Sequence, residues 1–77
     1  MLLNLDGELT KIGYRNTPRA ISYALGCKER AALNKFNGST PLTLSEARII
    51  KEKYFSNRDD MSIDWLFEDK PEERDFA

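Results

Sequence analysis

The chain has 77 residues, of which 40% are hydrophobic and 32% are charged, and its formal net charge is −1. This length leaves room for one small domain, and the composition is typical of a globular protein rather than a disordered one. No stretch of the sequence reaches the roughly 18 apolar residues of a membrane span. The first residues, MLLNLDGEL, have no basic region before the leucines, so we expect neither a signal peptide nor a membrane partner.

The residue types that the sequence lacks exclude several kinds of chemistry. There is no histidine, and Cys27 is the single cysteine. The absence of histidine excludes the common serine and cysteine triads and nearly every zinc site, and one cysteine cannot form an internal disulfide. We therefore expect a non-enzymatic binding protein of the reducing cytoplasm, with no metal, no cofactor and no small-molecule substrate.

The charged residues are segregated along the chain. Between Lys11 and Lys35 six basic residues accompany one acidic residue, Glu29, which gives this segment a charge of +5. Between Asp59 and Ala77 eight acidic residues accompany two basic ones, a charge of −6. The field of one face, rather than the sum over the chain, decides whether a protein binds a polyanion. The basic segment is therefore a candidate nucleic-acid surface, and an ordinary solvated surface is the alternative.

The beginning of the sequence predicts two helices. A first helix is indicated by an apolar stripe with spacings of three and four residues, formed by Leu2, Leu5, Leu9 and Ile12. A second, short helix is expected over 18–25, because Thr17 suits the N-cap position and Pro18 suits the first helical position. Gly26 follows, and a left-handed glycine commonly ends a helix.

A third helix is expected over 28–36, directly after a turn at Gly26. Its apolar residues Leu33 and Phe36 are expected to face the core. Because Ser22 is small, the second and third helices can cross closely at a steep angle. The outer face of the third helix then carries polar and charged side chains, namely Lys28, Glu29, Arg30, Asn34 and Lys35. A protruding helix of about 10–12 Å diameter fits the major groove of B-DNA.

A fourth helix is expected to begin with a capping box formed by Thr43 and Glu46. Its apolar positions are Leu44, Ala47, Ile50 and Tyr54. A polar turn separates it from a last short helix, SIDWLF, which Ser62 caps and whose inner side holds Ile63, Leu66 and Phe67. No strand alternation is present. We therefore expect an all-α fold, a compact bundle of about five short helices in one domain over 1–70, with an acidic, frayed tail over 71–77.

The helix pair and the segments after it carry a family resemblance. The core positions of the pair are Ile21, Ser22, Leu25, Gly26, Leu33 and Phe36, and PLTLSEARIIKEKY and SIDWLFED follow them. Over roughly residues 9–69 the chain resembles the lambda-repressor-like, Xre- or Cro-type helix-turn-helix family of bacterial and phage regulators. Leu33 and Phe36 lie one residue further from Gly26 than is usual in that family, which implies a longer turn. The resemblance implies a small sequence-specific DNA-binding regulator, a repressor.

The resemblance also implies roles for the polar residues of the helix pair, with double-stranded DNA as the partner. Base contacts are implied for Lys28, Glu29, Arg30 and Asn34. Arginine and lysine suit guanine, asparagine suits adenine, and glutamate accepts from cytosine. Phosphate contacts are implied for Thr17, Arg19, Lys35 and Asn37, helped by the partial positive charge of helix N-termini.

Two questions stay open at the C-terminal end of the sequence. Trp65 lies two residues from both Ile63 and Phe67, so it is a candidate homodimer contact or, alternatively, an aromatic cap over the core. Repressors of this kind commonly bind palindromic sites in pairs. The total charge of −1 and the acidic tail are unusual for a DNA-binding protein. They favour, as an alternative function, a protein-interaction module of the antirepressor or antitoxin-like kind on the same scaffold.

Overall fold

The computed structural model describes residues 1–70, and every regular element in that range is a helix. The helices are α1 (Leu3–Lys11), α2 (Thr17–Leu25), α3 (Glu29–Asn37), α4 (Leu44–Phe55) and α5 (Ile63–Leu66). The expected all-α class is therefore confirmed for the described part of the chain. No helix there is long and apolar enough to cross a bilayer. The tail expected over 71–77 lies outside the described residues.

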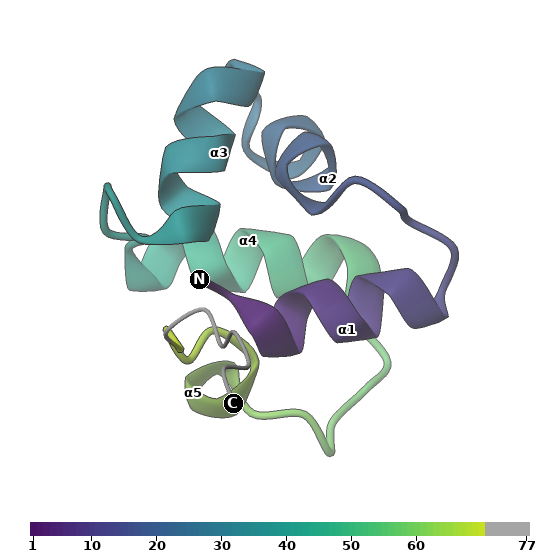
Figure 1. Cartoon of the computed structure of the whole chain (residues 1–77). Coiled ribbons are helices and arrows are strands. Elements are labelled where there is room, and N and C mark those ends of the chain that lie inside the picture. Colours follow the sequence, from purple (N-terminus) through teal and green to yellow (C-terminus); the bar gives the residue numbers. More distant parts are fainter. Residues whose placement is uncertain (71–77) are drawn as a thin grey trace, which may run out of the picture.

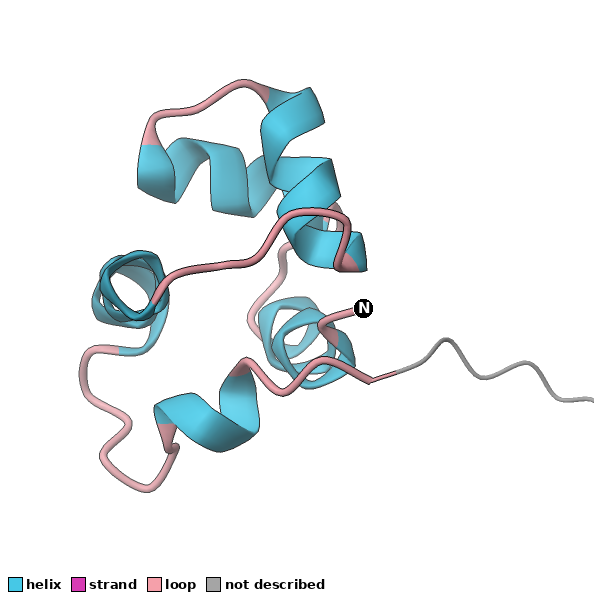
Figure 2. Cartoon of the chain, turned by 90° about the vertical axis from the view of Figure 1, so that its left-hand side faces the viewer, coloured by secondary structure: helices cyan, strands magenta, loops and turns pink. Residues whose placement is uncertain are grey.

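The helices are arranged in three tiers. Figures 1 and 2 show α1 and α4 in the middle, with the α2–α3 pair on one side of them and α5 on the other. In Figure 1, α2 is seen nearly end-on while α3 runs up the page, so these two helices cross at a steep angle. The pair thus forms one end of the molecule, and the segment after α4 forms the opposite end.

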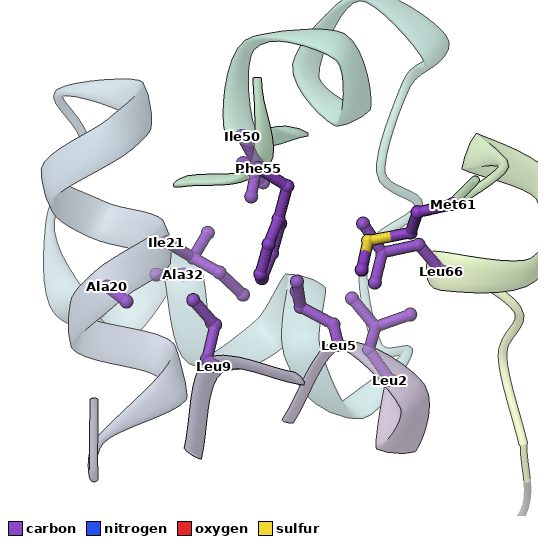
Figure 3. Close-up of a cluster of buried hydrophobic side chains, with 10 residues drawn as sticks. All are labelled: Leu2, Leu5, Leu9, Ala20, Ile21, Ala32, Ile50, Phe55, Met61 and Leu66. Carbon is purple, nitrogen blue, oxygen red and sulfur yellow. The ribbon is translucent and has the colours of Figure 1, made fainter. Parts of the chain in front are cut away.

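The hydrophobic core lies where the helices meet (Figure 3). Its buried side chains are Leu2, Leu5, Leu9, Ala20, Ile21, Ala32, Ile50, Phe55, Met61 and Leu66. Phe55 and Met61 flank the segment expected to be a polar turn, and neither was expected in the core. Helical periodicity gives no guidance at the end of a helix or beyond it, where tertiary contacts decide which side chains are buried. Full burial of such a side chain contributes about 1.5–3 kcal/mol.

Three apolar residues that were expected in the core are exposed instead: Ile12 by 48%, Leu33 by 44% and Leu44 by 56%. Ile12 follows the last residue of α1, so the periodicity of the helix no longer directs its side chain. In α3 the buried residue is Ala32, and Phe36, four positions later, packs on the core. Leu33 is rotated from Ala32 by about 100° around the helix axis, which turns it away from the core.

Two of the expected helix starts are confirmed. The Thr43 side chain accepts a hydrogen bond from the Glu46 N–H, and the Glu46 carboxylate accepts one from the Thr43 N–H, both at 3.1 Å. Ser62 Oγ accepts a hydrogen bond from the Trp65 N–H at 3.1 Å, which caps α5. Each cap satisfies N–H groups that have no partner within their own helix.

The first and last described residues lie next to each other (Figure 2) and are joined by hydrogen bonds. The Lys70 N–H donates to the Met1 carbonyl at 2.9 Å, and the Met1 amino group donates to the Lys70 carbonyl at 2.8 Å and also contacts the Asp69 carboxylate. The Leu2 N–H donates to the Phe36 carbonyl at 2.9 Å. The start of the chain therefore joins the end of α3 to the residues that follow α5.

Candidate nucleic-acid interface

The turn between α2 and α3 is closed by local hydrogen bonds. Gly26 ends α2 with a φ of 71°, in the left-handed region that glycine adopts without strain. The Ser22 carbonyl accepts hydrogen bonds from the N–H groups of Gly26, at 2.8 Å, and Cys27, at 3.2 Å. Lys28 is the N-cap of α3 but provides no side-chain hydrogen bond to it. The first N–H groups of α3 thus lack a side-chain cap at the tip of the turn, where a helix carries partial positive charge.

The four residues expected to contact bases lie at the start and on the outer side of α3. Lys28, Glu29 and Arg30 are exposed, and Asn34 is half-buried. The Asn34 carbonyl accepts a hydrogen bond from the Thr40 N–H at 3.1 Å, so the loop after α3 folds back beside it. Within residues 1–70 neither Lys28 nor Arg30 takes part in an ion pair. These two cations are therefore available to a ligand.

An ion pair links the two helices at this surface. Arg19 of α2 lies with its Nε 3.1 Å from Oε2 of Glu29 at the start of α3, and both side chains are more than half exposed. A pair this exposed contributes at most about 1 kcal/mol to stability. Its main consequence is electrostatic, because Glu29 neutralises one cation of a surface that otherwise carries positive charge.

The expected phosphate contact from Thr17 is wrong for this structure. Thr17 is 2% exposed, and its hydroxyl donates a hydrogen bond to Asp6 Oδ1 at 2.6 Å, which joins α2 to α1. Thr17 is also not the N-cap. That position belongs to Asn16, whose Oδ1 accepts from the Arg19 N–H at 3.1 Å. Because the cap lies one residue earlier than expected, Thr17 falls inside the helix and on its inner face.

Lys35 does not lie on the outer face of α3 as expected. Its Nζ is 3.2 Å from Glu46 Oε1 on α4, and the side chain is only 15% exposed. The positive charge of Lys35 is therefore neutralised by Glu46 within the protein. By contrast, Asn37 is exposed at the end of α3, where its Oδ1 accepts a hydrogen bond from the Ser39 N–H at 3.3 Å. The two side-chain N–H donors of Asn37 remain suited to a phosphate.

The structure adds Arg15 and Leu33 to the candidate interface. Next to the start of α2 lies a shallow hollow of about 280 Å³, lined by Gly13, Tyr14, Arg15, Asn16, Arg19, Ala20 and Tyr23. Arg15 is exposed there beside Arg19. Its position directly before the Asn16 cap was the available signal, since groups at helix starts commonly contact phosphate. Leu33 is the second addition, on the outer side of α3.

Most of the described acidic residues of the C-terminal segment lie at the end of the molecule opposite α2 and the start of α3. Asp59, Asp60, Asp64, Glu68 and Asp69 belong to the loop before α5, to α5, or to the residues after it. Figure 1 shows α5 separated from α2 and α3 by the middle tier. Asp69 is the exception, because its carboxylate lies beside Gly38 at the end of α3. Arg58 donates two hydrogen bonds to Asp60, at 3.0 and 3.1 Å, and thereby lowers the pKa of that carboxyl. Apart from Asp69, the described acids of this segment are thus separated in space from Lys28 and Arg30.

Trp65 lies on α5, far from the α2–α3 pair in Figure 1. Its side chain is 43% exposed, so it covers the core only in part. Its carbonyl accepts a hydrogen bond from Asn4 Nδ2 at 2.8 Å, which ties α5 to α1. A homodimer contact at Trp65 stays a prediction.

Comparison with known proteins identifies no relative: no family model, no curated protein and no solved structure matches the chain. Among residues 1–70, no group of three or more histidine, cysteine, aspartate or glutamate side chains could hold a metal ion.

Proposed function

We propose that this protein binds double-stranded DNA in a sequence-specific manner, with α3 in the major groove, and acts as a small transcriptional repressor. The observation that carries this proposal is the outer surface of α3. It presents Lys28 and Arg30, which form no ion pair within residues 1–70, at one end of the molecule, while α5 and the acids in the loop before it lie at the other. The steep crossing of α2 and α3 supports a lambda-repressor-like helix-turn-helix arrangement, which is part of the same proposal.

In this proposal each side chain has a role that its exposure allows. Arg30 donates to O6 and N7 of a guanine, a contact that discriminates against other bases by about 1–3 kcal/mol. Lys28 contacts a neighbouring base, and Asn34 suits an adenine. Arg15 and Arg19 at the start of α2 and Asn37 at the end of α3 contact phosphates and fix the register of α3 in the groove.

The net charge of −1 is compatible with this role. A phosphate backbone interacts most strongly with the charges nearest to it, because solvent ions screen more distant ones within about 8–10 Å. The acids of α5 and of the loop before it are on the far side and are repelled by the duplex, which favours approach with the start of α3 leading.

The proposal is tested by selecting bound sequences from a random duplex library and titrating the selected duplex at several salt concentrations. We expect a defined consensus and an affinity that falls steeply with salt, with a slope of about −0.9 for each phosphate contacted. Arg30→Ala should relax the base preference. Arg48→Ala is the matched control, because Arg48 is exposed on α4 and lines a hollow beside Asp59 and Ile63, away from α3. Absence of salt-sensitive duplex binding would refute the proposal.

A second candidate function is binding of a protein partner. A groove of about 530 Å³ runs between the α3–α4 loop, α4 and α5, and its apolar lining includes Leu42, Leu44, Ala47, Ile63 and Phe67. Leu44 is 56% exposed at its edge. A partner in this groove would be lost on Leu44→Asp and retained on Arg30→Ala. DNA binding through α3 has the opposite pattern, so these two variants distinguish the candidates.

A further inference from the structure

Leu33 is an apolar side chain in the middle of an otherwise polar helix surface. It is 44% exposed. Arg30, three residues before it, and Asn37, four residues after it, lie on the same side of α3 and are exposed. Ala32 is the fully buried residue of α3, and Phe36 packs on the core. Leu33 therefore contributes little to the interior.

A single exposed leucine needs no explanation on an ordinary surface. The position of Leu33 is different, because it lies at the centre of the surface that we propose to enter the major groove. Most groups on the major-groove edges of base pairs are hydrogen-bond donors and acceptors. The apolar exception is the C5-methyl group of thymine, which apolar side chains contact.

We infer that Leu33 recognises a thymine by contact with its methyl group, an inference that rests on the proposed DNA-binding function. The spacing on α3 also relates this thymine to the base that Arg30 contacts. With a rise of about 1.5 Å per residue, Leu33 lies about 4.5 Å further along the helix than Arg30. Successive base pairs are about 3.4 Å apart. The thymine is therefore expected one or two base pairs from the guanine that Arg30 contacts.

The test replaces each thymine of the selected duplex, one at a time, with deoxyuridine. Deoxyuridine lacks the methyl group and retains the hydrogen-bonding groups. The guanine that Arg30 contacts is the one whose replacement no longer weakens binding in the Arg30→Ala variant. At one thymine near that guanine, replacement by deoxyuridine should weaken binding of the wild-type protein about fourfold, as expected for the loss of one buried methyl-sized group. Leu33→Ala should bind the thymine and deoxyuridine duplexes equally. Leu44→Ala is the matched control, because Leu44 is an exposed leucine on another helix, and it should keep the fourfold difference.

The outcomes separate this inference from the proposed function. If the protein binds a defined consensus but no deoxyuridine replacement weakens binding, Leu33 does not recognise a thymine methyl. The same conclusion follows if Leu33→Ala keeps the full difference. Titrations of the wild-type protein alone show whether any deoxyuridine replacement weakens binding. The inference therefore remains testable even if Leu33→Ala folds poorly. A complete lack of duplex binding contradicts the proposed function instead.

Discussion

Lys35 of α3 and Glu46 of α4 are joined through one carboxylate oxygen that has a second partner. Glu46 Oε1 lies 3.2 Å from Lys35 Nζ and accepts the Thr43 N–H at 3.1 Å. The side chains of Lys35 and Glu46 are 15% and 28% exposed, so the contact is partly shielded from water. One side chain thus completes the cap of α4 and holds α3 against that helix, which positions the outer surface of α3.

This arrangement predicts a pH-dependent contribution to stability. The Thr43 N–H, and after it Lys35, lower the pKa of the Glu46 carboxyl below its ordinary value of 4.5. The unfolded chain therefore binds the proton more readily, and the stabilisation is complete above about pH 4.5 and is lost as the pH falls through the lowered folded-state pKa. Glu46→Gln should lower the free energy of unfolding at pH 7, and its difference from the wild type should shrink toward zero in acid.

Urea denaturation at a series of pH values measures this difference. The matched control is Glu52→Gln, because Glu52 is exposed on the same helix. That variant should stay within about 0.5 kcal/mol of the wild type at neutral pH, as is usual for surface substitutions. A Glu46→Gln difference that is constant with pH would show that the carboxylate charge has no part in the contact.

Because Glu29 forms an ion pair with Arg19, we expect that replacing Glu29 with a neutral residue increases the affinity for DNA. Glu29→Gln removes the anion that neutralises Arg19 and leaves the guanidinium free to contact a phosphate. On a duplex of random sequence at low salt we expect severalfold tighter binding, with a salt dependence steeper by up to about 0.9 in log–log slope. Fluorescence anisotropy at several salt concentrations measures both quantities. Glu68→Gln changes the net charge equally at the far end of the chain, so an equal effect of both variants would contradict a local role.

Two glycines predict stability changes of opposite sign. Gly7 lies inside α1 and Gly26 has a φ of 71°, and a Cβ atom at either position meets nothing within 4 Å. Gly7→Ala should raise the free energy of unfolding by about 0.5–1 kcal/mol, because alanine favours the helix. Gly26→Ala should lower it by about 1–2 kcal/mol, because the left-handed conformation is costly for a residue with a Cβ. Thermal denaturation followed by circular dichroism tests both, and changes of equal sign would contradict the assigned backbone conformations.

The two ends of α4 predict very different effects of shortening an apolar side chain. Phe55 is fully buried and Leu44 is 56% exposed. Phe55→Ala should cost about 3–5 kcal/mol, which is a large fraction of the total stability of so small a domain. Leu44→Ala should change stability by no more than about 0.5 kcal/mol. Phe55→Leu, with a smaller loss, gives a measurable intermediate if Phe55→Ala does not fold. Similar losses for Leu44→Ala and Phe55→Leu would contradict the burial found here.

The features that could be predicted from the sequence are those that depend on neighbouring residues. The capping box of Thr43 and Glu46, the left-handed Gly26 and the apolar stripe of α1 each involve contacts within one or two helical turns. Such signals can be recognised in the sequence without knowledge of how the helices pack. The same local signals predicted the number and order of the helices in residues 1–70.

The features that could not be predicted depend on partners far away in the sequence. Whether Ala32 or Leu33 faces inward is decided by the packing of α3 on the other helices, because a helix of nine residues has too few turns to define its inner face by periodicity alone. Likewise, a hydrogen bond to Asp6 holds the Thr17 side chain inside the protein, and an ion pair with Glu46 holds Lys35 against α4. The sequence by itself determined the helices and the positive charge around α2 and α3. Only the tertiary structure decided which of those side chains face solvent, because burial and long-range pairing exist only once the helices have packed together.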